Sequence, residues 1–129
     1  DEADQIARQI SLWSRGTPAP DLILTTGGTG LAPRDVTPEA TLSVLERRCG
    51  GIMELMRLRC YPQTPRAFLS RGEAGVTGRT LVINLPGAPR ASEECLRAIL
   101  DVLPHAVEEV RGEAYMSTSG HSRPGSSSN

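Results

Sequence analysis

Two short glycine loops carry the most suggestive chemistry of this sequence, and each follows an apolar run. Gly27, Gly28, Thr29 and Gly30 follow the run at residues 21–26, and Pro86 and Gly87 follow the run at 79–85. A glycine loop between a buried strand and a helix can present backbone N–H groups to a phosphate. A tight turn without ligand gives the same pattern, and this loop lacks the lysine of a P-loop and the spacing of a dinucleotide fingerprint. The loop alone therefore leaves phosphate binding and a plain turn as equal alternatives.

Asp35 favours the phosphate interpretation. It comes shortly after the first glycine loop and just before Thr37-Pro38-Glu39, a pattern that predicts a helix start with Thr37 as N-cap. A carboxylate at that position can hold Mg²⁺ against phosphate oxygens, as phosphoryl and nucleotidyl transfer require. The alternative is that Asp35 only caps a turn, which aspartate often does.

Helices and strands alternate in the pattern of the rest of the chain. Apolar residues at three- and four-residue spacing predict a helix over residues 2–15, with Trp13 on its buried stripe, and another over 51–60. Continuous apolar runs predict strands buried on both faces at 21–26 and 79–85. Further helices are predicted from Ser92 to Leu103 and from Pro104 to about Arg111. Such a pattern indicates an α/β sheet, in which ligands bind at the carboxyl ends of the strands, where both glycine loops lie.

The composition excludes several classes of function. A net charge of −1 and a pI of about 6.1 give no bulk attraction to nucleic acid or to an anionic membrane, and no apolar run is long enough to span a bilayer. All 14 cationic side chains are arginines, so any cation that contacts phosphate from this chain must be a guanidinium. The three cysteines, Cys49, Cys60 and Cys95, have neither disulfide-framework nor zinc-site spacing, which fits reduced thiols in the cytoplasm.

The last part of the chain differs in composition. After Gly112, Ser, Gly, Thr and Pro dominate to Asn129, with almost nothing to bury. We therefore expect one domain over residues 1–112 and a disordered tail or linker over 113–129.

Three segments together resemble the molybdopterin adenylyltransferase family, the MogA, MoaB and gephyrin-G type. They are LILTTGGTGLAPRDVTPEAT (residues 22–41), LSRGEAGVTGRTLVINLPGAPRASEECL (69–96) and PHAVEEVRG (104–112). The similarity covers about residues 1–112, and the APRDVTPEAT and INLPG segments fit the MogA and gephyrin-G branch best. The resemblance implies a three-layer sandwich with a mostly parallel sheet and helices on both faces. Members also carry a first strand, helix and second strand that have no counterpart here, so we expect the chain to be N-terminally incomplete.

The resemblance also implies an activity: transfer of AMP from Mg-ATP to the terminal phosphate of molybdopterin, with release of pyrophosphate. It assigns phosphate and nucleotide binding to the two glycine loops. Asp35 and Asp1 match the catalytic and metal-ligating acids, and Ser70, Arg71 and Asn84 match the pterin pocket.

The family further implies a homotrimer and a molybdate-inserting partner of the MoeA or gephyrin-E type, separate or fused. For the trimer, the apolar surface at residues 52–56 is one candidate interface. The alternative function is a non-catalytic molybdopterin-binding or assembly module, which would keep the fold without turnover. Retention of GGTG, Asp35 and LSR favours the enzyme.

Overall fold

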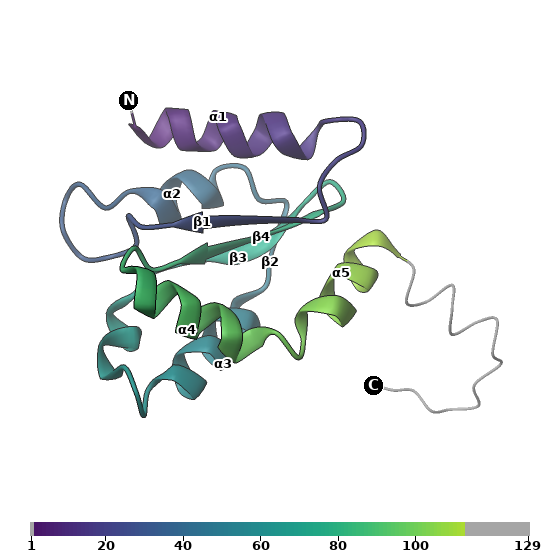
Figure 1. Ribbon diagram of the computed structural model, residues 1–129. Coiled ribbons are helices and arrows are strands. Elements are labelled where there is room, and N and C mark those ends of the chain that lie inside the picture. The colour runs from purple at the N-terminus through teal and green to yellow at the C-terminus, as the bar shows by residue number, and fades with distance from the viewer. Residues whose placement is uncertain (1, 113–129) are drawn as a thin grey trace, which may run out of the picture.

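The computed structural model describes residues 2–112, which form a sheet between two layers of helices (Figure 1). Helices α1 (Glu2–Ser14) and α2 (Thr37–Leu42) cover one face of the sheet. Helices α3 (Gly50–Cys60), α4 (Pro89–Ile99) and α5 (Leu103–Arg111) cover the other, and a short 3-10 helix, η1 (Pro65–Leu69), follows α3. The predicted three-layer α/β architecture is confirmed.

The sheet has the strand order β1-β4-β3-β2. Strands β1 (Leu22–Thr26) and β4 (Thr80–Leu85) are parallel, whereas β3 (Ala74–Thr77) and β2 (Arg47–Arg48) join as antiparallel strands. The expectation of a mostly parallel sheet is therefore wrong for the described part of the chain. The reason is the two-residue connection between β3 and β4, which contains Gly78 at φ +60° and can only return the chain antiparallel.

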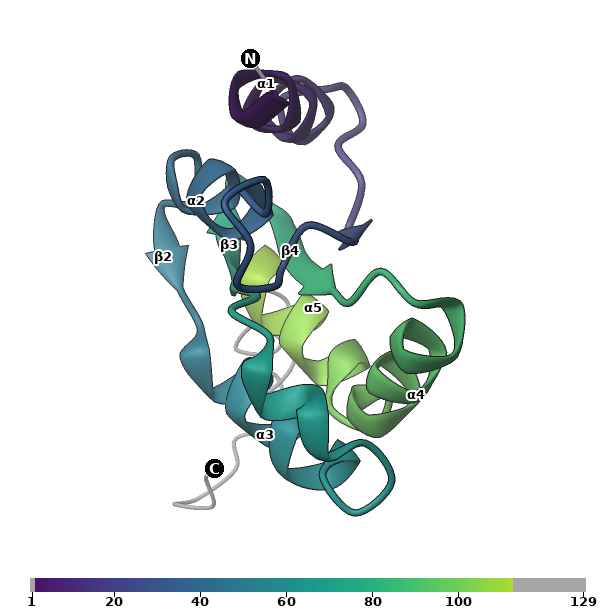
Figure 2. The same ribbon diagram turned by 90° about the vertical axis from the view of Figure 1, so that its left-hand side faces the viewer.

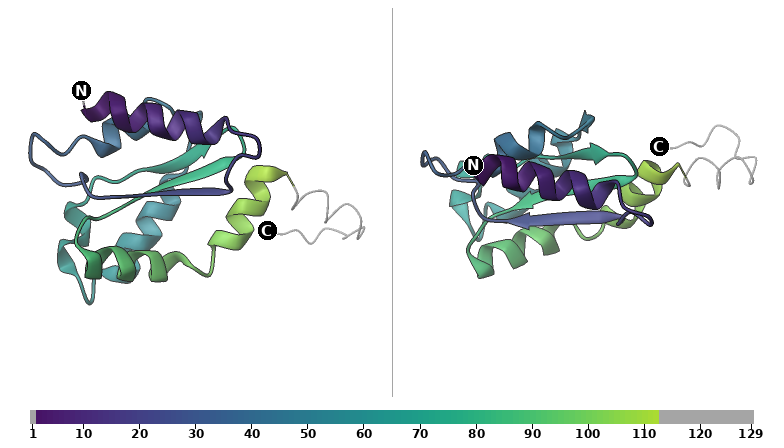
Figure 3. Two further views of the ribbon diagram at one scale, coloured as in Figure 1. Left: turned by 45° about the horizontal axis from the view of Figure 1, so that its top comes forward. Right: turned by 90° about the horizontal axis from the view of Figure 1, so that it is seen from above.

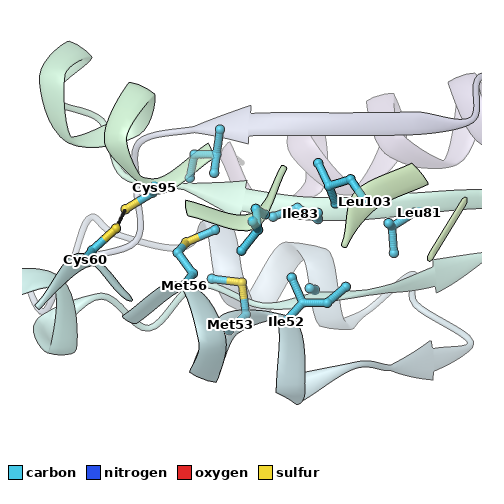
Figure 4. Close-up of a cluster of buried hydrophobic side chains, with 11 residues drawn as sticks. Ile52, Met53, Met56, Cys60, Leu81, Ile83, Cys95 and Leu103 are labelled. Atoms are coloured by element: carbon cyan, nitrogen blue, oxygen red, sulfur yellow. Dashed lines mark hydrogen bonds between the residues drawn. The ribbon is translucent and has the colours of Figure 1, made fainter. Parts of the chain in front are cut away.

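The central strand β4 is buried along its whole length and divides the core into two halves. Its side chains alternate between the two faces, as in any strand. Leu81, Ile83 and Leu85 pack in the larger cluster with α3, α4 and α5, part of which Figure 4 shows. Val82 packs in the smaller cluster with Ile10 of α1 and Ile23 of β1.

Two expectations about exposed surfaces are wrong. Trp13 is 52% exposed, because Ile10 and Ser14 are the residues that α1 buries. Ile52, Met53 and Met56 of α3, expected as a candidate trimer surface, are buried against the chain's own sheet and α4. Large apolar side chains exposed on this side of the molecule are instead Leu58, Tyr61, Phe68 and Leu69.

Both glycine loops lie at the same edge of the sheet, where β1 and β4 end. Figures 2 and 3 show the connection from β1 to α2 and the connection from β4 to α4 leaving the same edge. This follows from the parallel pairing of β1 with β4, because parallel neighbours end at the same edge. No helix within residues 2–112 combines the length and the apolar character needed to cross a bilayer.

Candidate functional site

The two glycine loops lie in direct contact. The Gly27 N–H donates a hydrogen bond of 2.9 Å to the Leu85 carbonyl, which continues the β1–β4 pairing into the loops. Gly27 and Gly28 have φ values of +90° and +71°, which glycine adopts without strain and other residues rarely adopt. The sequence prediction that Gly27–Gly30 and Pro86–Gly87 meet at one place agrees with this geometry.

The first loop packs against the start of α2. A Cβ on Gly28 would collide with the Thr37 side chain, and the Thr37 N–H donates to the Gly28 carbonyl at 3.1 Å. The N-cap is Val36, not Thr37 as predicted, and no side chain caps the helix. Thr29 is 5% exposed, so its side chain supports the loop from inside.

Asp35 is half-buried and closes the far side of the same loop. Its Oδ2 accepts a hydrogen bond from the Ala32 N–H at 3.1 Å, and its own N–H donates to the Ala32 carbonyl at 2.9 Å. Asp35 therefore caps the turn, as the alternative interpretation expected, and uses one carboxylate oxygen to do so. Oδ1 has no hydrogen-bond partner within residues 2–112, so it is available to a ligand or a cation.

Arg71 reaches from the segment after η1 across to this loop. Its Nε donates to the Gly30 carbonyl at 2.8 Å, its Nη2 to the Asp35 carbonyl at 2.7 Å, and its Nη1 to Glu39 Oε2 at 2.5 Å. Three of the five guanidinium N–H groups thus donate to acceptors of the protein itself. The side chain is 35% exposed, so part of its guanidinium remains accessible to solvent.

A cavity of about 290 Å³ lies beside the second glycine loop, between α3, η1 and the start of α4. It is lined by Met53, Met56, Arg57, Thr64, Arg66, Ala67, Ser70, Pro86, Ala88, Ala91 and Cys95. A neighbouring hollow of about 510 Å³ shares Arg57 and Ser70 with it. Apolar walls with two guanidiniums and hydroxyls suit a flat ring system that carries an anion.

Ser70 and Arg57 form the polar wall of that cavity. Arg57 donates to the Ser70 carbonyl from Nε at 3.2 Å and from Nη2 at 2.9 Å, and to the Gly72 carbonyl at 3.1 Å. The Ser70 hydroxyl accepts from the Gly72 N–H at 3.2 Å, which leaves its own hydrogen to donate. The predicted pterin residue Ser70 therefore lines a cavity, whereas Arg57 was missed because a lone arginine on a helix resembles a solvated charge.

Asn84 is fully buried below the two loops. Its Nδ2 donates to Thr25 Oγ1 at 2.8 Å and to Thr41 Oγ1 at 3.0 Å, and its Oδ1 accepts from the Glu73 N–H at 3.0 Å. This amide ties β1, α2 and the segment before β3 together. We infer that it supports the pocket from below, and does not touch a ligand as the sequence interpretation assumed.

The sulfur atoms in this region belong mainly to the core. Cys60 and Cys95 are buried free thiols with their Sγ atoms 3.6 Å apart (Figure 4). Burial first, and the neighbouring Cys60 thiol second, raise the pKa of Cys95 to about 12. The Cys95 thiol is therefore protonated at neutral pH, and the residue serves as part of the cavity wall.

The metal prediction rests on Asp35 within the described residues. Asp1, the second predicted acid, lies outside them, and residues 2–112 contain no cluster of three or more His, Cys, Asp or Glu side chains that could hold an ion. Mg²⁺ is often held by one or two carboxylates together with substrate phosphates, and the open Oδ1 of Asp35 beside the first glycine loop is compatible with that mode.

Comparison with known proteins identifies the family. A family described as "Probable molybdopterin binding domain" matches residues 1–105. The chain belongs to this family. The residues of both glycine loops, Asp35 and the cavity lie within the matched range.

Named relatives and solved structures agree with membership of the molybdopterin-binding domain family. The chain is 47% identical over 96 residues to a molybdopterin adenylyltransferase of Helicobacter pylori strain J99, covering 74% of this chain and 54% of that protein. It is 43% identical over 121 residues to the molybdenum cofactor synthesis protein cinnamon of Drosophila melanogaster, covering 94% of this chain and 20% of that protein. The chain thus spans about half the length of the first relative and a fifth of the second.

The fold of the molybdopterin-binding domain is shared at higher identity by a solved structure. The MoaB molybdopterin biosynthesis enzyme of Thermus thermophilus is 55% identical, with a TM-score of 0.79, over 85% of this chain and 69% of that chain. This match shows that most of the present chain shares its fold with that protein.

Proposed function

We propose that the protein acts in molybdenum-cofactor biosynthesis by transferring AMP from ATP to the terminal phosphate of molybdopterin. The observation that carries this proposal is the meeting of both glycine loops with Asp35 at the carboxyl ends of the parallel strands β1 and β4. Relatives named molybdopterin adenylyltransferase share this stretch of sequence, which supports the assignment.

The reaction joins two polyanions. An oxygen of the pterin phosphate attacks the α-phosphorus of ATP, the bond from that phosphorus to the β-phosphate bridging oxygen breaks, and pyrophosphate leaves with the electron pair. The nucleophile is already ionised at neutral pH, so neither Asp35 nor Asp1 need act as a base. The obstacle is electrostatic repulsion, which fixed dipoles and cations must offset.

The first glycine loop and Asp35 would hold the triphosphate. Backbone N–H groups of residues 28–30 face phosphate oxygens in this proposal, because the Gly27 N–H is bound to the Leu85 carbonyl. Gly87 permits the close approach of the two loops. Asp35 Oδ1 would hold Mg²⁺, and Asp1 is the proposed second ligand. Bound Mg²⁺ would supply positive charge against the phosphate oxygens.

The cavity beside the second loop would take the pterin. Ser70 and Pro86 line it, and Arg57 supplies a guanidinium at its polar wall. Arg71 adds positive charge between the cavity and the first loop. Asn84 would contribute by holding β1 and α2 in place under the pocket.

A second candidate function is a molybdopterin-binding module without turnover. It is favoured by the description of the matching family, a probable molybdopterin binding domain, which names binding alone. For either function we propose a homotrimer in the cytoplasm that passes its pterin product to a molybdate-inserting protein or fused domain.

The deciding experiment supplies molybdopterin and ATP labelled at the α-phosphate. Label on the pterin, with an equal amount of pyrophosphate released, supports the transferase. Molybdopterin binding without transfer contradicts the transferase and supports the binding module. Absence of both binding and transfer contradicts both functions.

A further inference from the structure

Arg71 makes all of its hydrogen bonds as a donor to one short segment, residues 29–39. Its backbone N–H donates to the Thr29 carbonyl at 2.8 Å, in addition to the guanidinium bonds to Gly30, Asp35 and Glu39. The segment contains the end of the first glycine loop, the Asp35 turn and the first turn of α2. One side chain therefore joins three parts of the site that the chain itself connects only through a loop.

The loop between these points has few other hydrogen bonds. Within residues 31–35 the structure gives the two bonds that join Ala32 to Asp35 and the bond from Arg71 to the Asp35 carbonyl. The Ala32–Asp35 bonds shape the turn but do not attach it to the rest of the protein. Arg71 supplies that attachment, because it belongs to the segment between η1 and β3.

The geometry at Arg71 requires a guanidinium. Three acceptors in different directions, two carbonyls and a carboxylate, are satisfied at 2.5–2.8 Å from three different nitrogen atoms of one planar group. An ammonium is a single point from which these three acceptors cannot all be reached at those distances.

Glu39 sets the orientation of that guanidinium. Its carboxylate accepts from Nη1 at 2.5 Å, and this hydrogen bond is the main cause that holds the pKa of Glu39 below its usual range. The Glu39 side chain is 59% exposed, and Arg71 is the side chain that binds its carboxylate within residues 2–112.

We propose that Arg71 and Glu39 form a positioning pair that holds the Asp35 turn against the glycine loop. The effect of this pair on catalysis rests on the proposed function, whereas its effect on the loop does not. Arg71 then acts mainly through the placement of Asp35 Oδ1, so its loss changes the dependence of the reaction on Mg²⁺ more than it changes the affinity for the pterin.

The first test measures hydrogen exchange of the backbone amides in residues 31–36 of the protein without ligands. We expect Arg71→Ala to make exchange about tenfold faster. This corresponds to losing the net free energy of about one hydrogen bond from the closed state of the loop. Arg71→Lys should restore only part of the protection, and Glu39→Gln should give an intermediate increase. Arg79→Ala is the matched control, since Arg79 is exposed in the turn between β3 and β4 and should leave this loop unchanged.

Unchanged exchange of residues 31–36 in Arg71→Ala overturns the proposal. If Arg71→Ala does not fold, Glu39→Gln decides, because it alters an exposed carboxylate and keeps the arginine. This arm needs no turnover, so it stands even if the protein proves not to transfer AMP.

The second test compares kinetic constants of the same variants. The Mg²⁺ concentration for half-maximal transfer should rise about tenfold in Arg71→Ala. Loss of a residue that supports a metal ligand commonly lowers metal affinity by about 10- to 100-fold, and this expectation takes the lower value. The KM for molybdopterin should change less than this. A large rise in that KM with an unchanged Mg²⁺ dependence contradicts the proposal and makes Arg71 a direct ligand contact. Absence of transfer by the unaltered protein counts against the proposed function alone.

Discussion

Gly87 lies against Gly27 so closely that a Cβ added to Gly87 would be 3.1 Å from the Gly27 Cα. The two loops therefore meet backbone to backbone, at the point where β1 and β4 end. This contact and the positive φ of Gly27 explain why both loops contain glycine. The contact also brings the first glycine loop next to the cavity wall at Pro86.

Gly28→Ala should disrupt the first loop. The substitution places a methyl group on the Thr37 side chain at a backbone φ of +71°, which costs about 1–2 kcal/mol before the collision is counted. We expect a lower melting temperature and loss of ATP binding. Calorimetry of unfolding and a nucleotide titration would measure both.

Gly51→Ala is the control for this experiment. Gly51 lies in the first turn of α3 with nothing within 4 Å of the added Cβ, so alanine should be neutral or stabilise by up to about 1 kcal/mol. Equal effects of the two substitutions would show that the loop conformation is unimportant.

Asn84→Leu should destabilise the protein by about 3 kcal/mol, because it leaves the Glu73 N–H and two threonine hydroxyls without their buried partner. Urea unfolding would give this value. Gln9→Ala, an amide exposed on α1, should change the free energy of unfolding by less than about 0.5 kcal/mol. A similarly small effect at Asn84 would refute its supporting role.

One of the three cysteines should react readily with a thiol reagent in the folded protein. Cys49 is exposed, whereas Cys60 and Cys95 are buried and the raised pKa of Cys95 keeps its thiol protonated. Mass spectrometry after brief labelling should therefore find modification at Cys49, and all three sites should react in denaturant. Rapid labelling of Cys95 without denaturant would contradict the packing of α3 against α4.

Stability should fall as the pH drops below about 4.5, and Glu39 should contribute to that fall. Hydrogen bonding to Arg71 lowers the pKa of Glu39, so its contribution is complete above the unfolded value and is lost as the pH passes down through the folded value. Glu39→Gln should therefore show a smaller loss of melting temperature between pH 6 and pH 3, roughly the span across which carboxylates titrate. Glu54→Gln, an exposed carboxylate of α3 without an ion pair within residues 2–112, should follow the unaltered protein.

Strand β4 could be predicted because it is buried along its whole length. Strand β1 was expected to be buried on both faces, but Leu24 is 37% exposed and only Ile23 is buried, so β1 could be predicted from its apolar residues alone. Residues 22–26 and 80–85 are continuous apolar runs that end at glycine, and these two features place both loops. The two antiparallel strands, β3 and β2, could not be predicted in the same way. β3 has the sequence AGVT and β2 is the pair Arg47–Arg48, so neither contains the apolar alternation that marks a strand.

The roles of the polar side chains were less predictable than their positions. Nothing in the sequence shows that the guanidiniums of Arg57 and Arg71 are turned toward carbonyl oxygens, since those acceptors lie 13 to 41 residues away. Burial of Asn84 and the contact of Cys60 with Cys95 likewise depend on how α2, α3 and α4 pack. Long-range packing decides these roles, and the local pattern does not encode it.

Asp35→Asn tests the central claim, that this acid at the end of the phosphate loop serves AMP transfer. The amide keeps the acceptor for the Ala32 N–H but weakens the hold on Mg²⁺. Asp101→Asn, which removes an exposed partner of Arg59 in the turn between α4 and α5, is the matched control.

The measurement is the rate of AMP transfer from ATP to molybdopterin and the affinity for molybdopterin, on one preparation of each variant. We predict that Asp35→Asn lowers the rate by about 100-fold, the upper end of the range for altered metal sites, and leaves the pterin affinity within about twofold of the unaltered protein. Asp101→Asn should change neither quantity. An unchanged rate in Asp35→Asn, beside an active unaltered protein, would contradict the account.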